Sequence, residues 1–526
     1  MKKIILLIAG CLVMNAAAAQ QTNRRQFEAT QKLMQFVNYL GASYVDTLNM
    51  NQLVDDAIIE MLDQLDPHST YVSAEEMKGV RENFNANFEG IGIEFNVLND
   101  TIIVVNTIPG GPSEQVGLSP NDRIVTVADT SVVGVKQTDV PNILRGPKGT
   151  VVNLGVLRHG VADLLKFRIV RDKIPIYTVD ASYKVSGDIG YVKINRFAAT
   201  TNQELQQAIR DLGAMSGLIL DLRSNGGGHM DQSVYVSNTF LKRGSLVVST
   251  EGRVMPAEKL TADNNPSFPK GKVIILVDEF SASASEIVAG AIQDWDRGLI
   301  MGRPTFGKGL VQRQFPLVDG SAVRITTARY HTPTGRVVQR PYEKGKTDDY
   351  YADFNARFTT DSLATMPDSL KYTTLRSHRT VYGGGGITPD IIVARDTTGY
   401  SSYWSSLNRQ GVIAEYVIDY MDKNRTSLES RYPDFNAYDS RFSIDQTMLD
   451  NLVALGTQRG IEYVEADMKT STTLLRSQLK ALIAQKLWSM SEYYQVINGE
   501  TDQMFAKALE VMQNWDQYSK GIMDTE

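Results

Sequence analysis

The stretch KVIILVDEFSASASE, residues 272–286, decides how the central part of the chain folds. Its first half is a continuous apolar run, which is typical of a strand buried on both faces of a parallel sheet. GLILDL (217–222) repeats this pattern, and each run is followed by small or polar residues and then by a helical stretch. The alternation predicts an α/β core over residues 176–396, with one helix beginning near Ala284.

The serines of SASASE (281–286) lie at this predicted junction of strand and helix. A helix N-terminus has free backbone amides and a positive dipole end, so it suits a nucleophile with an oxyanion hole. Ser283-x-x-Glu286 is also a capping box, and on the local pattern alone the cap is the favoured interpretation.

A serine nucleophile needs a base, and Lys308 in GRPTFGKGLVQ (302–312) is the candidate. The five histidines occupy no evident hydrolase motif, and G-x-S-x-G is absent from the sequence. A lysine can act as a base if burial without a carboxylate partner lowers its pKa from about 10.4 toward about 7 or 8. No acid flanks Lys308 for several residues, and Gln312 would share its face on a strand, where a neutral amide could orient the amine. The alternative is a surface lysine in a glycine turn.

The same stretch nearly matches the phosphate-binding loop G-x-x-x-x-G-K-[ST]. Gly309 stands where that loop needs a hydroxyl for Mg²⁺, and LVQRQFPL after it reads as a strand instead of a helix. Asp278, the expected acidic strand end, precedes the loop, which reverses the usual order. These departures argue against a nucleotide-binding enzyme. The net charge of −6 and the lack of a long basic run also give no case for nucleic acid.

The N-terminus predicts export. Lys2 and Lys3 precede an apolar run from Ile4 to Met14, and the small residues of NAAAAQ follow. We expect a signal peptide over residues 1–19, cleaved after Ala19, and a periplasmic or otherwise secreted protein without a transmembrane segment. IAGC (8–11) also resembles a lipoprotein box, but cleavage before Cys11 would leave a short apolar core, so anchoring there is the less favoured alternative. Cys11 is the only cysteine, so the mature chain would contain neither disulfides nor a cysteine-based metal site.

The rest of the chain divides into regions that differ in their expected secondary structure. Residues 20–82 read as helical, with one apolar stripe at helical spacing. Residues 83–175 form a small β-dominated module of short strands and turns, and residues 397–526 read as helical. The stripe in the first region consists of Val54, Ala57, Ile58, Met61, Leu62 and Leu65.

FSASASEIVAGAIQDWDRGLIMGRPTFGKGLVQ (280–312) closely resembles the carboxyl-terminal processing, or tail-specific, proteases. Those enzymes are serine endopeptidases with a Ser–Lys dyad supported by a glutamine. Their serine lies 25 residues before the lysine and their glutamine four after it, which is the spacing of Ser283, Lys308 and Gln312. The resemblance therefore selects Ser283 among the three serines.

Other blocks match this family in order over about residues 30–395. FEGIGIEF, IPGGPSEQVGLSPNDRIV and LRGPKGTVVNLGVLR resemble its PDZ domain, inserted before the protease core. The resemblance implies that Gly90, Ile91, Gly92 and Ile93 form a nest of amides for a substrate C-terminus. An ordinary strand start, or a PDZ fold that binds nothing, is the alternative.

LDLRSNGGG (220–228) resembles the family's D-L-R-x-N-x-G-G stretch. The resemblance implies that an amide of Gly227 or Gly228 joins that of Ala284 in an oxyanion hole, and it leaves the choice between the glycines open. Glycine suits such close approach to a substrate. Gly226 stands where the family often has proline. A plain strand-to-helix turn is the alternative.

The sequence thus predicts an α/β multidomain protein. An α/β protease core carries an inserted PDZ domain between an N-terminal helical segment and a helical C-terminal region. The expected function is a secreted serine endopeptidase that recognises protein C-termini and cleaves through an acyl-enzyme. The expected partners are protein or peptide substrates, with a homo-oligomer or an adaptor left open, and neither a metal nor an organic cofactor is implied. The rival hypothesis is a non-catalytic PDZ peptide-binding scaffold.

Overall fold

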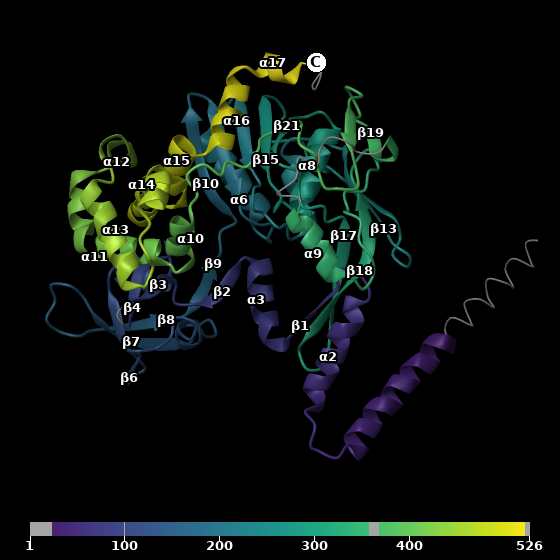
Figure 1. Ribbon diagram of the computed structural model, residues 1–526, viewed down its shortest axis with the longest axis horizontal. Coiled ribbons are helices and arrows are strands. Elements are labelled where there is room, and N and C mark those ends of the chain that lie inside the picture. Colours follow the sequence, from purple (N-terminus) through teal and green to yellow (C-terminus); the bar gives the residue numbers. More distant parts are fainter. Residues whose placement is uncertain (1–23, 99, 357–367, 521–526) are drawn as a thin grey trace, which may run out of the picture.

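The computed structural model describes residues 24–98, 100–356 and 368–520. The expected signal peptide (1–19) and Cys11 lie outside these residues. Figure 1 shows a β-rich module, a central α/β core and a group of C-terminal helices, each contributed by consecutive parts of the chain. The predicted α/β multidomain class is confirmed.

The core is built on a sheet in the order β10-β11-β12-β15-β16-β21, in which every neighbouring pair except β10–β11 is parallel. Both apolar runs of the sequence form central strands of this sheet, and their side chains are completely buried apart from that of Lys272. The strands are β10 (Val179–Ser186), β11 (Ile189–Ile194), β12 (Gly217–Asp221), β15 (Lys272–Val277), β16 (Leu299–Gly302) and β21 (Ile391–Ile392).

Alternation along these strands sends side chains to two separate hydrophobic clusters. Leu218 and Leu220 pack with helices α6 (Thr201–Leu212), α7 (Met230–Asn238) and α8 (Ala284–Asp294) on one face. Ile219 packs with α16 (Gln503–Gln513) on the other face. A helix from the C-terminal region therefore completes the core, which the sequence did not predict.

A second sheet, in the order β1-β18-β13-β14 with β17 also paired to β18, lies beside this core. Its first strand corrects a prediction, because residues 70–72 fall in the region expected to be helical. β1 contains the extended-favouring residues Thr70, Tyr71 and Val72, and it pairs antiparallel with β18. The strands are β1 (Thr70–Val72), β13 (Leu246–Glu251), β14 (Glu258–Thr261), β17 (Leu310–Pro316) and β18 (Ala322–His331).

The β-rich module contains a sheet in the order β3-β4-β5-β7-β8, with β6 paired to β5 and β3 at an edge. A separate pair, β2–β9, joins the module to the core. The elements are β2 (Asn87–Gly90), β3 (Ile93–Leu98), β4 (Thr101–Thr107), α4 (Pro112–Gln115), β5 (Arg123–Val127), β6 (Thr130–Ser131), α5 (Val140–Leu144), β7 (Val151–Leu157), β8 (Leu165–Val170) and β9 (Asp172–Pro175).

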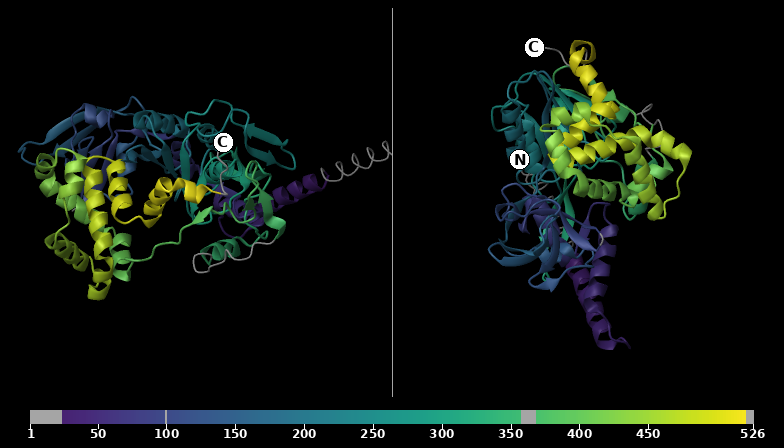
Figure 2. Two further views of the ribbon diagram at one scale, coloured as in Figure 1. Left: turned by 90° about the horizontal axis from the view of Figure 1, so that it is seen from above. Right: turned by 90° about the vertical axis from the view of Figure 1, so that its left-hand side faces the viewer.

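The N-terminal region consists of a helix over residues 24–43, α2 (Met50–Asp63) and α3 (Ala74–Asn85). The apolar stripe predicted for α2 is helical but is mostly not buried: only Leu62 of that set is buried, whereas Met61 is 59% exposed. Figures 1 and 2 show the reason, because the helix over 24–43 and much of α2 project away from the body of the protein.

The C-terminal helices from α10 to α15 pack around their own hydrophobic cluster. They also contact the β-rich module, where Asp422 pairs with Arg123 at 2.9 Å and Lys486 with Glu94 at 3.5 Å. Among the described helices, none combines the length and the apolarity that a bilayer crossing requires. The remaining elements are α9 (Thr347–Ala356), a 3₁₀ turn (Asp368–Leu370), β19 (Lys371–Thr373), β20 (Thr380–Tyr382), α10 (Ser402–Arg409), α11 (Val412–Arg431), α12 (Phe435–Arg441), α13 (Gln446–Gln458), α14 (Glu465–Leu487), α15 (Met490–Glu500) and α17 (Trp515–Ser519).

Candidate active site

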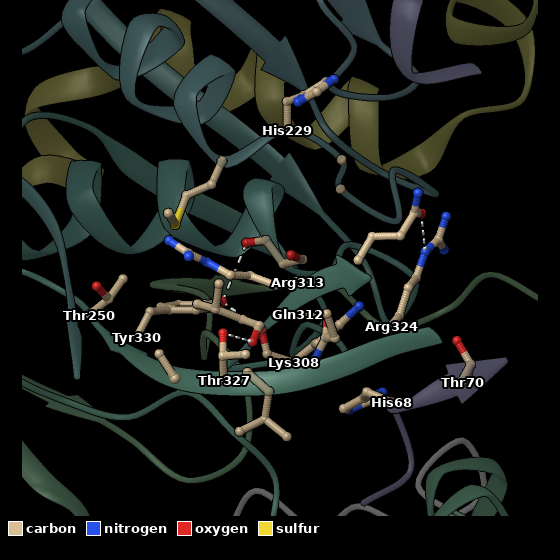
Figure 3. A pocket seen from close by; sticks show the side chains of 18 of the residues that line it. His68, Thr70, His229, Thr250, Lys308, Gln312, Arg313, Arg324, Thr327 and Tyr330 are labelled. Carbon is tan, nitrogen blue, oxygen red and sulfur yellow. Dashed lines mark hydrogen bonds between the residues drawn. The ribbon is translucent and has the colours of Figure 1, made fainter. Parts of the chain in front are cut away.

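A cavity of about 900 Å³ lies between the start of α8, the loop after β12 and strands β17 and β18. Figure 3 shows that Lys308 and Gln312 lie close to one another in it, with Arg324 and His68 nearby. Ser283 and the glycines Gly226, Gly227 and Gly228 line the same cavity. The predicted dyad residues and the predicted oxyanion-hole loop therefore meet at one place.

Ser283 immediately precedes α8, so the predicted helix start at Ala284 is confirmed. The backbone of Ser283 has φ +53° and ψ −109°, which is a strained conformation for a residue with a side chain. An ordinary N-cap residue adopts the β region. The amide of Ser283 does donate to Glu286 Oε2 at 2.9 Å, as in a capping box, but capping alone does not account for this strained backbone.

Glu286 connects several backbone segments of the site by hydrogen bonds, and its side chain is fully buried. Its Oε1 accepts hydrogen bonds from the Thr305 hydroxyl and the Gly307 amide, and its Oε2 accepts from the amides of Ser283 and Lys308. Burial raises the pKa of Glu286 to about 7, while these donors act in the opposite direction by favouring the carboxylate. One side chain thus holds both candidate dyad residues by their backbones.

Burial lowers the pKa of Lys308, and the nearby guanidinium of Arg324 lowers it further. No acid flanks Lys308 in the sequence, but the fold brings Glu286 and Asp66 close enough to act in the opposite direction and raise the pKa of Lys308. Their effect is smaller than that of burial. The net result is a lowered pKa, which makes the neutral amine that a base requires easier to reach than in an exposed lysine.

Tyr330 also joins the two candidate dyad residues, through their carbonyls. Its buried hydroxyl lies 2.7 Å from the carbonyl of Lys308 and 3.3 Å from that of Ser283. Burial raises the pKa of Tyr330 well above its usual value, so the hydroxyl keeps the proton that it donates to these carbonyls.

Gln312 reaches the cavity by a different route from the one predicted. Lys308 precedes β17 and is not part of it, and a bulge between Val311 and Gln312 interrupts the strand's alternation. The same-face argument is therefore wrong. The bulge places Gln312 opposite Thr326 of β18, and Gln312 lines the cavity there.

The glycine loop after β12 packs tightly against both sides of the site. A Cβ on Gly227 (φ +96°) would lie 2.8 Å from Ser283 Cβ and 3.0 Å from the Ala284 nitrogen. A Cβ on Gly228 (φ +145°) would lie within bonding distance of the carbonyl of Phe197. Glycine is required at both positions. The Gly227 amide already donates to Asn225 Oδ1 at 2.9 Å.

In the β-rich module, Gly90 ends β2 and Ile93 begins β3, so residues 90–93 form a tight connection at the end of the edge strand. Gly92 adopts φ +75°, and Ile91 is buried. The carbonyl of Ile91 accepts from the Ser113 amide and that of Gly92 from the Ile108 amide, both at 3.0 Å.

Known proteins identify the two central units. The model of peptidase family S41 matches residues 188–351, and that of the PDZ domain matches residues 90–169. The carboxy-terminal-processing protease of Bartonella bacilliformis is 36% identical over 354 residues, which cover 64% of this chain and 80% of that protein. The chain belongs to the carboxy-terminal processing proteases of peptidase family S41.

A second relative agrees. The carboxy-terminal processing protease CtpA of Bacillus subtilis is 36% identical over 327 residues, covering 61% of this chain and 69% of that one. The solved photosystem II D1 C-terminal processing protease is 31% identical and covers 57% of this chain and 82% of its own, with a TM-score of 0.33. Residues 403–489 match a family of unknown function, DUF8443. The predicted resemblance and the assignment as a serine peptidase are confirmed.

Sequence reasoning missed residues that lie around the dyad. Glu286 was considered only as half of a capping box, and Tyr330, Arg324 and Thr326 were not singled out. Asp66, in the region expected to be helical, was likewise not assigned to the site. Among the described residues, no cluster of three or more His, Cys, Asp or Glu side chains is arranged to hold a metal ion.

Proposed function

We propose that Ser283 is the nucleophile of this protease and that Lys308 is its general base. The observation that carries the proposal is the shared carboxylate of Glu286, which holds the backbone amides of both residues beside one cavity. The strained backbone of Ser283 supports it, since such strain clusters at active sites. The lowered pKa of Lys308 supports its role as a neutral amine.

In this mechanism, the Ser283 hydroxyl oxygen attacks the scissile carbonyl carbon while the Lys308 amine takes its proton. The tetrahedral intermediate collapses, the C–N bond breaks, and Lys308 donates the proton to the leaving amine. Water, deprotonated by the same amine, then attacks the acyl-enzyme carbonyl. The bond from this carbon to the Ser283 oxygen breaks, Lys308 returns the proton to that oxygen, and the new carboxyl terminus is released. Gln312 orients the amine without adding a charge.

The oxyanion of both intermediates is held by the amides of Ala284 and Gly228. Ala284 is the first residue of α8, so its amide has no carbonyl partner within the helix. Gly228 is preferred over Gly227 because the Gly227 amide is occupied by Asn225, whereas that of Gly228 makes no hydrogen bond among the described residues.

The PDZ domain presents the substrate's C-terminus. A peptide would add to the free edge of β3, and its carboxylate would enter the amides of residues 90–93 (Gly90, Ile91, Gly92 and Ile93). This mode suits a protease that selects chains by their ends and cleaves internal bonds.

Export of the protease is part of the proposal. It is supported by the sequence of residues 1–19, which has the charged, apolar and small-residue segments of a signal peptide. N-terminal sequencing of the protein recovered from a periplasmic fraction tests this. A start at residue 20 is expected, whereas an acylated Cys11 or an intact Met1 would contradict it.

Cleavage of fluorescein-labelled casein by purified variants tests the mechanism. Ser283→Ala and Lys308→Ala should each abolish turnover, while Lys344→Ala, on an exposed loop, should retain it. Unaltered cleavage by either dyad variant would defeat the proposal. A wild-type protein that binds peptides but cleaves nothing would favour the PDZ scaffold.

A further inference from the structure

A hydrogen-bonded chain of side chains connects the N-terminal segment to Gln312. The Gln312 amide nitrogen donates to Thr326 Oγ1 at 3.1 Å, and the Thr326 hydroxyl donates to Asp66 Oδ1 at 3.0 Å. Asp66 and Thr326 lie 260 residues apart in the sequence. β1 brings them together, because its pairing with β18 places residues 66–69 beside Thr326.

Asp66 is built into this position and is only 7% exposed. Its Oδ1 also accepts from the amides of His68 and Ser69, at 3.0 and 3.1 Å, and its Oδ2 accepts from the Ser69 hydroxyl at 2.7 Å. The Ser69 oxygen in turn accepts from the Thr326 amide at 3.1 Å. Every hydrogen bond that Asp66 makes in this cluster is one that it accepts.

These bonds fix the order of donor and acceptor in the series from Gln312 through Thr326 to Asp66. A threonine hydroxyl has a single proton, and here Asp66 receives it. Thr326 can therefore only accept from Gln312, so it selects the NH₂ end of the glutamine amide. The carbonyl oxygen of Gln312 is then the end of the amide that Thr326 leaves available, and Gln312 and Lys308 line the same cavity.

We propose that Asp66 is a positioning residue of this protease, which acts through Thr326 to hold the Gln312 amide with its carbonyl oxygen toward Lys308. The inference rests on the proposed role of the Ser283–Lys308 dyad. A carbonyl oxygen can accept a proton of the amine and keep its lone pair aimed at Ser283, whereas a flipped NH₂ group would compete for that lone pair. The N-terminal segment is thus a structural part of the active site.

Thr326 offers the matched pair of variants that isolates this relay. Thr326→Val removes the hydroxyl and keeps the β-branched shape, and Thr326→Ser keeps the hydroxyl. We expect Thr326→Val to lower kcat for fluorescein-labelled casein about tenfold, with little change in KM. Thr326→Ser should recover most of the loss. Thermal unfolding of each variant reports whether the fold is intact.

The decisive comparison repeats Thr326→Val in a Gln312→Ala background. If Thr326 acts through Gln312, the second substitution should lower kcat by less than about twofold there, because residues that act as a unit are not additive. Asp66→Asn, which can donate to Thr326 and so permit the flipped amide, should lower kcat in the wild-type background and not in the Gln312→Ala background.

Full kcat in Thr326→Val, or an equal loss in both backgrounds, would overturn the inference. Failure of the proposed dyad has a different result: the Ser283→Ala protein would then cleave casein as the wild-type protein does. If Asp66→Asn does not fold, the two Thr326 variants alone give the answer.

Discussion

The backbone amides of Ser283 and Lys308 donate to the same oxygen of Glu286, at 2.9 and 2.8 Å. The two residues come from different elements and are separated by 25 positions, so this carboxylate sets their relative position. Tyr330 adds a second link through their carbonyls. The two residues of the proposed dyad are thus held by their main chains, and the bonds to Glu286 and Tyr330 do not involve their side chains.

Replacing Glu286 by glutamine should disable the site. The glutamine side chain places an NH₂ group where one of the Glu286 oxygens accepts two hydrogen bonds. The two buried donors at that position lose their acceptor, which lowers the free energy of unfolding by about 1–3 kcal/mol for each donor. We expect a lower free energy of unfolding in urea and a large loss of casein cleavage. Glu343→Gln, at an exposed position, is the control. Wild-type stability and activity in Glu286→Gln would show that the shared carboxylate is dispensable.

The pH dependence of cleavage should follow the ionisation of Lys308. Activity rises with pH as the amine loses its proton, and burial together with Arg324 places this rise below the ordinary lysine pKa. Arg324→Gln removes a positive charge, so the pKa of Lys308 increases and the rise in kcat/KM moves to higher pH. Arg313→Gln, on the adjacent strand, serves as the control. A shift to lower pH in Arg324→Gln would contradict the assignment.

The glycine loop should tolerate a methyl group at only one of its positions. Gly228→Ala meets the Phe197 carbonyl and Gly227→Ala meets Ser283, so each should lower kcat/KM about a hundredfold or more. Gly226→Ala meets no atom within 4 Å and should retain most activity. Equal kinetics for these alanine variants would argue against a close-packed oxyanion loop.

Peptide capture by the PDZ domain should depend on Gly92. A Cβ there would lie 3.1 Å from Ile174 Cδ1 and would also strain a φ of +75°. Fluorescence anisotropy of a fluorescein-labelled peptide with a free apolar C-terminus should show weaker binding to Gly92→Ala in the Ser283→Ala background. Gly110→Ala carries comparable backbone strain (φ +72°), and its Cβ meets no atom within 4 Å. This variant therefore distinguishes a general effect of backbone strain from a specific effect at the binding site. Equal affinities of the two variants would contradict the proposal that residues 90–93 bind the peptide carboxylate.

Patterns within a short segment predicted much of the molecule. The continuous apolar runs predicted the central strands β12 and β15, because residues buried on both faces of a sheet must all be apolar. The serine junction predicted the start of α8 at Ala284, and the resemblance of residues 280–312 predicted the family. The apolar stripe predicted the helix α2 but not its exposure, since a stripe shows that a helix has an apolar face but not what covers it.

Contacts between distant segments could not be predicted in the same way. The sequence showed no acid near Lys308, yet folding brings Glu286 and Asp66 close enough to affect its pKa. The bulge before Gln312 and the bond from Thr326 to Asp66 depend on the register of β18 with β17 and β1.

The sequence by itself determined which segments become strands and helices, where the serine, lysine and glutamine stand, and to which family the chain belongs. Local periodicity and short spacings carry this information, because they reflect interactions within a few residues. Only the tertiary structure decided which carboxylate holds the backbones of Ser283 and Lys308, which glycine amide is occupied and which partner the Gln312 amide meets. Those properties arise from hydrogen bonds and burial between segments up to 260 residues apart, and such contacts leave no local pattern to read.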